Sequence, residues 1–164
     1  MQLLLIRHGI AAPEGPGLPD HARPLTPEGR ERWQQAVRGL QRLGVQLDRV
    51  CHSPLRRAVE TAELLMPLLR GEAVRSAALA SPPGQAWLDE LRGECVALVG
   101  HQPWMGEAVA WLTTHARQRG STLVFKRGGV AWLEGPPQPG RMVLRAFLPP
   151  KVLRTLAEVS APRN

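Results

Sequence analysis

The amino-acid sequence predicts an α/β fold, a three-layer sandwich in which helices flank a mostly parallel central sheet. Two short apolar runs, at residues 2–7 and 95–99, each end in a group of polar residues. Runs of this length and composition are typical of buried parallel strands. Segments with apolar residues at helical spacing alternate with the runs along the chain. This alternation favours a parallel sheet covered by helices on both faces.

The first helix has the clearest boundaries. Thr26 is a suitable N-cap, Pro27 suits the first helical position, and Gly44 ends the segment. A glycine turn at Gly128-Gly129 predicts a hairpin between residues 122–126 and 130–133. In chain order, the other strands are expected at 2–7, 49–52, 73–76, 95–99 and 143–148, and the helices at 26–44, from Pro54 with an apolar face reaching Leu69, at 85–91, 103–115 and 151–159.

Length and composition indicate a single domain spanning residues 1–164. A chain of this length in which 43% of residues are hydrophobic can bury a substantial core. No stretch approaches the roughly 18 consecutive apolar residues that a membrane helix needs, so no membrane partner is expected. The first residues lack the basic leader and cleavage site of a signal peptide, which predicts a cytoplasmic location.

The net charge of +7 initially suggests a nucleic-acid-binding protein. The arginines are nevertheless scattered along helices beside glutamates, without a basic tail or an aromatic RNA-binding motif. This pattern favours a solvated basic surface that attracts anionic substrates.

Cys51 and Cys95 lie in apolar strand-like segments and are expected to be buried thiols. No zinc-type spacing occurs, and neither a metal ion nor another cofactor is expected.

Three predicted strand ends carry residues suited to binding phosphate. The first strand ends in Arg7-His8-Gly9, the second in the turn 53–58, which contains two arginines, and the fourth in Gly100-His101. If these strands are neighbours, their ends meet at one edge of the sheet. Arginine binds phosphate oxygens through two parallel hydrogen bonds, and helix N-termini add oriented N–H groups. The sequence therefore predicts one anion-binding crevice.

These segments resemble the histidine phosphatase superfamily. The resemblance rests on Arg7-His8-Gly9, Pro24-Leu25-Thr26 with Gly29, Ser53-Pro54-Leu55-Arg56-Arg57-Ala58 with Thr61-Ala62, and Gly100-His101. It covers nearly the whole chain in the right order and implies a phosphoglycerate mutase-like fold. The compact length and the segment 126–129 look most like the short SixA-type phosphohistidine phosphatases.

The resemblance implies a role for each matching residue. His8 would be the nucleophile, with Arg7, Arg57 and His101 as its catalytic partners on the phosphoryl oxygens. Gly9 is expected to let the backbone approach the phosphate. Two nearby arginines should lower the pKa of His8 and keep its attacking nitrogen unprotonated.

Several neighbouring side chains have open interpretations. Arg56 competes with Arg57 for the phosphate, and it is expected to face solvent or an anionic substrate surface. Arg23 could reach a substrate from its loop and is a further candidate for phosphate binding. His52 is expected to be a satisfied strand-end histidine, and Trp104 is the tryptophan that could line the pocket.

The sequence departs from the family pattern at the proton donor. Many relatives carry a carboxylate after the third strand, whereas residues 77–83 here contain no acid, and position 10 is isoleucine. The remaining candidates are Glu14, Asp20, Asp89 and Glu90. An alkoxide leaving group gains about 10²–10⁴-fold from a general acid. An imidazole leaving group needs little such help because the pKa of its conjugate acid is near neutral.

The missing acid therefore favours phosphohistidine over a sugar phosphate as substrate. Only about 40 residues separate Arg57 from His101, too few for the helical cap of larger relatives, so an open crevice is expected to admit a phosphorylated protein. Two alternatives remain: a phosphatase for small phosphoesters, such as a sugar or cofactor-precursor phosphate, and a non-catalytic module that binds phosphate or a phosphoprotein. The sequence leaves the oligomeric state open.

Overall fold

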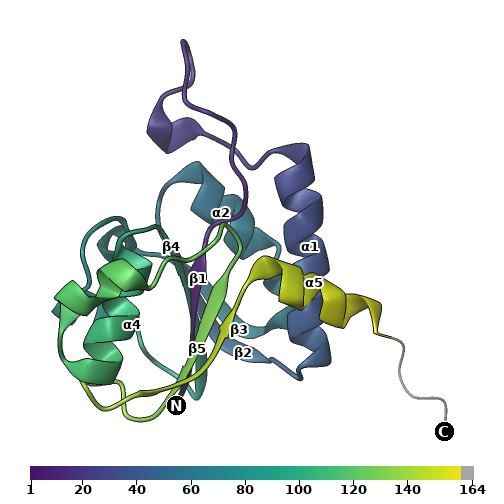
Figure 1. Cartoon of the computed structure of the whole chain (residues 1–164). Coiled ribbons are helices and arrows are strands. Elements are labelled where there is room, and N and C mark those ends of the chain that lie inside the picture. Colours follow the sequence, from purple (N-terminus) through teal and green to yellow (C-terminus); the bar gives the residue numbers. More distant parts are fainter. Residues whose placement is uncertain (160–164) are drawn as a thin grey trace, which may run out of the picture.

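A six-stranded sheet forms the centre of the computed structural model, which describes residues 1–159 (Figure 1). The strands are β1 (Gln2–Arg7), β2 (Leu47–His52), β3 (Leu69–Arg75), β4 (Cys95–Gly100), β5 (Val130–Glu134) and β6 (Val143–Leu148). Their order in the sheet is β3-β2-β4-β1-β5-β6. Only β5 runs against the other strands. The sheet is thus mostly parallel, as predicted.

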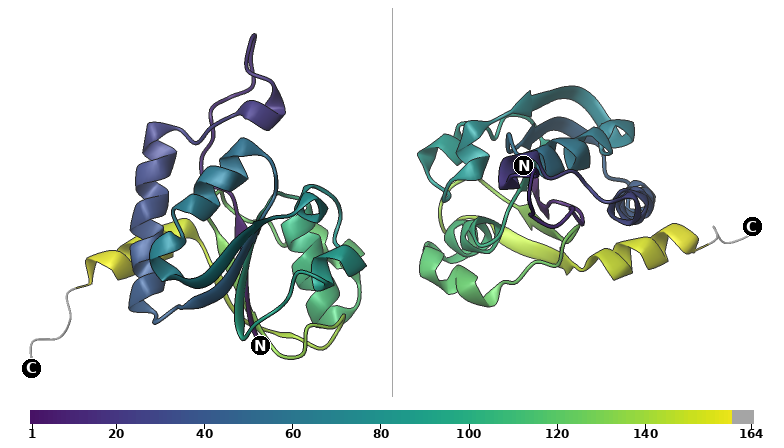
Figure 2. Two further views of the ribbon diagram at one scale, coloured as in Figure 1. Left: turned by 180° about the vertical axis from the view of Figure 1, so that it is seen from behind. Right: turned by 90° about the horizontal axis from the view of Figure 1, so that it is seen from above.

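Helices cover both faces of this sheet (Figure 2). The α-helices are α1 (Pro27–Arg42), α2 (Arg56–Glu63), α3 (Gln85–Leu88), α4 (Trp104–Thr114) and α5 (Pro150–Glu158). Short 3₁₀ turns are η1 (Asp20–Ala22), η2 (Met66–Leu68), η3 (Ala77–Ala80) and η4 (Arg117–Thr122). One layer contains α1, α2 and α5, and the other contains α3 and α4. The predicted three-layer α/β sandwich is confirmed.

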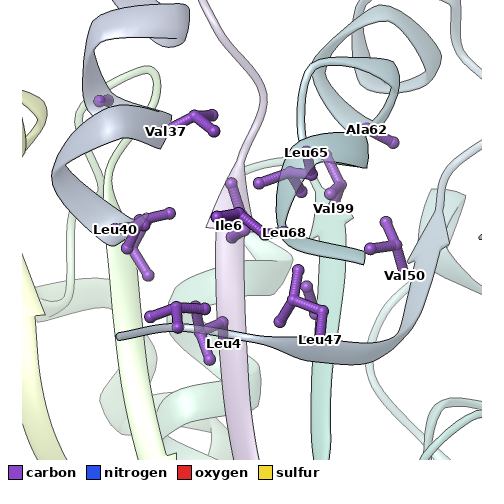
Figure 3. Close-up of a cluster of buried hydrophobic side chains, with 14 of the residues drawn as sticks. Leu4, Ile6, Val37, Leu40, Leu47, Val50, Ala62, Leu65, Leu68 and Val99 are labelled. Atoms are coloured by element: carbon purple, nitrogen blue, oxygen red, sulfur yellow. The ribbon is translucent and has the colours of Figure 1, made fainter. Parts of the chain in front are cut away.

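Alternating side chains of β1 supply both halves of the core. Leu4 and Ile6 pack with the layer of α1 and α2 (Figure 3), whereas Leu3 and Leu5 pack with the layer of α4. All four side chains are fully buried. Each contributes about 1.5–3 kcal/mol by leaving water. Burial on both faces explains why β1 is a continuous apolar run.

The strand register brings the predicted site segments together. Arg7 at the end of β1 pairs with Gly100 at the end of β4, and His52 at the end of β2 pairs with Val99. Because β4 lies between β1 and β2, the residues that follow all three strands emerge at one edge. The loop before α1, residues 10–24, rises above the same edge (Figure 1).

Of two predicted helix boundaries, the start of α1 is confirmed and the end of α2 is wrong. The N-cap of α1 is Thr26, whose hydroxyl accepts the Gly29 N–H at 2.9 Å, as predicted. The helix predicted from Pro54 to Leu69 is wrong at its end, because α2 stops at Glu63 and Leu69 begins β3. Pro67 has no N–H to donate to the Glu63 carbonyl, so the α-helix does not continue, and the 3₁₀ turn η2 replaces the last predicted turns.

The predicted hairpin between residues 122–126 and 130–133 is also wrong. The first of these segments forms no strand, and β5 pairs with β1 and β6 instead. The glycine turn serves the end of β1: the Gly128 N–H donates to the carbonyls of Arg7 and His8, and the Arg7 N–H donates to the Gly129 carbonyl. The loop 123–129 therefore lies against the predicted site.

Among the described helices, none is both long and apolar enough to cross a membrane.

Candidate active site

The His8 ring is held in one protonation state by its neighbours. It is 6% exposed, and its Nδ1 lies 2.7 Å from the Gly9 carbonyl oxygen. A carbonyl only accepts hydrogen bonds, so Nδ1 carries the proton and Nε2 keeps its lone pair. The Arg57 Nε–H points at that lone pair from 3.3 Å. His8 thus presents an unprotonated nitrogen beside a guanidinium group.

Burial lowers the pKa of His8 to about 3. The hydrogen bond to Gly9 opposes this shift, whereas His101, Arg57 and Arg7 add to it. The predicted direction of the pKa shift is confirmed, but its predicted cause is corrected, because loss of solvation outweighs the nearby cations. The imidazole is neutral throughout the physiological pH range, as a nucleophile requires.

Arg57 and Arg56 point in different directions, although they are adjacent in the first turn of α2. Arg57 is buried and reaches His8, while Arg56 has a 57% exposed side chain and binds Glu60 at 2.9 Å. Successive helical residues project about 100° apart, so only one can face the pocket. The structure places Arg57 there and Arg56 at the solvent side.

The His101 ring lies beside the His8 ring. Their centroids are 5.1 Å apart, and His101 is 5% exposed. Its Nε2 lies 2.7 Å from the Ser53 hydroxyl, which also accepts the Leu55 N–H at 3.3 Å. The pKa of His101 is lowered to about 4, chiefly by burial; Arg57 and Arg7 contribute to the lowering, and Asp20 opposes it. Two neutral imidazoles therefore meet at the ends of β1 and β4.

Two nitrogen atoms of this cluster lack hydrogen-bond partners. Among the described residues, the buried side-chain polar atoms without a partner are Arg7 Nε and His101 Nδ1. The guanidinium of Arg7 is anchored through Nη1 to the Phe125 carbonyl at 2.6 Å. Buried unsatisfied groups are rare and cost about 1–3 kcal/mol each. Both orphans belong to residues that the sequence assigned to phosphate binding, and an oxyanion would satisfy them.

Thr61 fixes the backbone around His8. Its hydroxyl donates to the Arg57 carbonyl at 2.6 Å and accepts the Gly9 N–H at 3.0 Å. Thr61 thereby links the end of β1 to α2. Gly9 was expected to let the backbone approach a phosphate, and in this structure its N–H is engaged in the link to Thr61.

Asp20 contacts Arg57 from the loop before α1. The Arg57 Nη1 donates to the Asp20 carbonyl at 2.7 Å, and Nη2 donates to the carboxylate at 3.1 Å. Arg23 binds the other carboxylate oxygen at 2.7 Å and the Ala12 carbonyl at 2.6 Å. Partial burial would raise the pKa of Asp20, but the hydrogen bonds from Arg57 and Arg23 lower it. Arg23 thus contacts Asp20, and through it Arg57.

The other acid candidates lie elsewhere. Glu14 is exposed in the loop, Asp89 accepts a hydrogen bond from Gln85, and Glu90 forms an ion pair with Arg49. The acid-free segment 77–83 does lie close to the site, because the carbonyl of Leu79 in η3 packs against Gly100. A carboxylate in this segment would lie near the site, and the sequence has none there.

Contacts and burial describe the surroundings of His52, Trp104 and the two cysteines. His52 is half-buried, with Nδ1 3.0 Å from the Ser53 carbonyl oxygen, as expected of a strand-end histidine. The Trp104 ring meets the His101 ring edge-on at 6.4 Å. Both cysteines are free; Cys51 is buried, whereas Cys95 is only half-buried, which corrects the prediction for Cys95. Within residues 1–159, no three His, Cys, Asp or Glu side chains gather where they could hold a metal ion.

Comparison with known proteins agrees with this geometry. The family model of the histidine phosphatase superfamily (branch 1) matches residues 3–81. An uncharacterized protein from Picosynechococcus sp. is 36% identical over 142 residues, which cover 81% of this chain and 84% of that protein. The chain belongs to the histidine phosphatase superfamily. Members of this superfamily are phosphatases.

Several solved structures of phosphatases share the fold. The protein histidine phosphatase SixA, complexed with tungstate, is 26% identical with a TM-score of 0.75, over 93% of this chain and 99% of that chain. The alpha-ribazole phosphatase from Shigella flexneri is 20% identical with a TM-score of 0.71, over 92% and 97%. The phosphoserine phosphatase from Entamoeba histolytica is 16% identical with a TM-score of 0.68, over 93% and 98%. The phosphoglycerate mutase-like fold is confirmed.

Proposed function

We propose that the chain is a metal-independent phosphatase that forms a phospho-His8 intermediate and removes phosphate from protein phosphohistidine in cytoplasmic phosphorelay signalling. One observation carries the catalytic part of this proposal. His8 is buried, neutral and fixed with its Nε2 lone pair facing Arg57, and the unpartnered nitrogens of Arg7 and His101 belong to the same cluster. This arrangement combines a nucleophile with donors for an oxyanion.

The first step transfers the phosphoryl group to the protein. The Nε2 lone pair of His8 attacks phosphorus in line, a P–N bond to His8 forms, and the bond to the leaving group breaks. The Arg7 and Arg57 guanidinium groups and the His101 Nδ1–H bind the non-bridging oxygens, where charge is spread in a loose transition state. A leaving imidazole takes up a proton from water as it departs.

The second step restores the protein. Water attacks the phosphorus of phospho-His8, the P–N bond breaks, and its electron pair returns to Nε2. Inorganic phosphate leaves with the elements of water. His8 finishes neutral because its proton stays on Nδ1, hydrogen-bonded to the Gly9 carbonyl, throughout. The same oxyanion contacts serve both steps, since the same phosphoryl group is transferred twice.

The surroundings of the pocket support phosphohistidine as the substrate. Among the described residues, Asp20 supplies the carboxylate that contacts Arg57, and its ion pairs with Arg57 and Arg23 keep it ionised, so it holds no proton to donate at neutral pH. The neighbouring turn η3 brings no acid. An alkoxide leaving group would suffer from this absence, whereas an imidazole leaving group would not. The SixA structure, at 26% identity, supports the same substrate class.

A substrate comparison tests the proposal. Phosphate release would be measured from a phosphohistidine-containing protein, from free phosphohistidine and from a panel of sugar and alkyl phosphates, with His8→Asn as the blank. We expect kcat/KM for the phosphohistidine compounds to exceed that for the alkyl esters by about 10²-fold or more. A preference for the alkyl esters would replace this proposal with the small-phosphoester alternative.

A further inference from the structure

A basic cavity opens beside the candidate active site. It has a volume of about 570 Å³ and lies between α1, the loop 123–129 and the start of α5. Arg7 and Gly9, the two neighbours of His8, form part of its wall. No acidic residue lines it, and its walls carry six cationic side chains: Arg7, Arg32, Lys126, Arg127, Lys151 and Arg154. We call this cavity the basic cavity.

Arg7 and Arg127, two cations of the basic cavity, lie close enough to repel each other. Burial lowers the pKa of Arg7, and Arg127 and then Arg57 lower it further. Within residues 1–159, Arg32 pairs with Glu28, while the other five cations of the cavity form no ion pair. Like charges gathered in a concave site produce a positive potential that attracts anions. The cost of this repulsion is relieved when an anion binds.

The distribution of the charges indicates what kind of anion fits. Lys151 and Arg154 are three residues apart on α5 and lie about 5–6 Å from each other on one face. Arg32 stands on α1, and Arg127 on the loop across from them. One phosphate group contacts a single part of such a wall, whereas several carboxylates along a peptide can contact all of it. Apolar residues, including Ile10, also line the cavity and can contact the aliphatic parts of the peptide's side chains.

We propose that the basic cavity binds acidic side chains next to the phosphorylated residue of a protein substrate. The inference rests on the proposed function and adds a sequence preference to it. Arg7 belongs both to the wall of the cavity and to the candidate active site. A phosphoryl group at His8 and carboxylates in the cavity can therefore be carried by one polypeptide. The open face of the cavity allows that polypeptide to enter from the surface.

Two matched phosphohistidine peptides test this proposal. One carries Asp and Glu around the phosphohistidine, and the other carries Asn and Gln at the same positions. The test variant combines Lys151→Glu with Arg154→Glu. The control variant makes the same charge change at two exposed arginines outside the cavity, Arg38→Glu and Arg119→Glu.

We expect the unaltered protein to prefer the acidic peptide by about tenfold in kcat/KM, mainly through KM, and the preference should shrink as salt is added. The test variant should lose this preference, the control variant should keep it, and neither should change turnover of free phosphohistidine. Equal rates on the two peptides, or a preference that survives in the test variant, would overturn this inference but not the proposed function. Absence of hydrolysis of every phosphohistidine compound would overturn the proposed function as well.

Discussion

The Ser53 hydroxyl lies 2.7 Å from Nε2 of His101, and this contact sets the tautomer of the histidine ring. The Ser53 oxygen already accepts the Leu55 N–H. Within residues 1–159, its own proton has no other acceptor, so we assign it to the hydrogen bond with His101 Nε2. The ring proton of neutral His101 then resides on Nδ1, the nitrogen without a partner. Ser53 therefore turns His101 into a hydrogen-bond donor, and the proposed mechanism directs that donor to a phosphoryl oxygen.

Replacing Ser53 should slow the reaction without removing any group from the phosphate. In Ser53→Ala the ring of His101 is free to adopt the other tautomer, whose Nδ1 lone pair repels an oxyanion. We expect kcat to fall about 10-fold, as is typical when one charge-stabilising hydrogen bond is weakened. Ser76→Ala is the control, because Ser76 is also buried but has no recorded bond to a histidine ring. Equal rates in the two variants would show that Ser53 does not position His101.

Asp20 occupies the N–H groups of Arg57 that the proposal assigns to phosphoryl oxygens. Asp20→Asn removes the competing charge but keeps the side-chain shape. We expect the inhibition constant of inorganic phosphate to fall about 3- to 10-fold, in the range of a half-exposed ion pair. Turnover of phosphohistidine should be retained. A large loss of kcat confined to alkyl esters would instead identify Asp20 as a general acid.

The two buried histidines should make the fold sensitive to mild acid. Their pKa values are about 3 and 4 in the folded protein, against 6.5 for a free imidazole. Between pH 6.5 and 4 the unfolded chain binds more protons, so stability falls as the pH falls, by up to about 1.4 kcal/mol per pH unit for each ring. Urea unfolding from pH 7 to 4.5 would measure the slope. His101→Gln should reduce it, and an unchanged slope would contradict the assigned pKa shift.

Gly29 permits close contact between α1 and the segment after His8. A Cβ on Gly29 would overlap the Ile10 carbonyl. Gly29→Ala should therefore destabilise the fold by about 1–3 kcal/mol, although alanine is the better helix former. Gly15→Ala, where a Cβ meets nothing within 4 Å, should change the free energy of unfolding by less than about 0.5 kcal/mol. Denaturant unfolding of both variants decides the matter, and equal stabilities would refute the close contact.

The sequence predicted the site best where a predicted strand ends in residues that can bind phosphate. Apolar runs ending in Arg7-His8 and Gly100-His101 predicted strands whose ends meet, and the parallel register of β1 and β4 brings them together. The relation of Ser53 to His101 could not be predicted in this way, because it depends on β2 lying next to β4. The contact of Asp20 with Arg57 joins a loop to a helix, and no local pattern encodes it.

The wrong predictions of the fold concern the hairpin at residues 122–133 and the end of α2. Residues 122–126 and the glycines after them form a good hairpin pattern, but the turn is used to bind the end of β1. β5 then pairs with β1, a strand far away in the sequence. The glycine turn was predicted correctly, but the segment that it contacts, the end of β1, was not. The apolar pattern of α2 likewise continued past Pro67, but α2 ends at Glu63, because Pro67 lacks the N–H that would bond to the Glu63 carbonyl in a continued helix.

Trapping the phosphorylated protein tests the central claim most directly. The protein would be mixed with a phosphohistidine substrate, quenched in denaturing alkali within one turnover, digested and analysed by mass spectrometry. We predict one added phosphoryl group on the peptide that contains His8, absent from His8→Asn, which should also lose at least about 10³-fold in kcat. Full hydrolysis by His8→Asn, or turnover with no phosphate on His8, would contradict the account, and binding without hydrolysis would identify a phosphate-binding module.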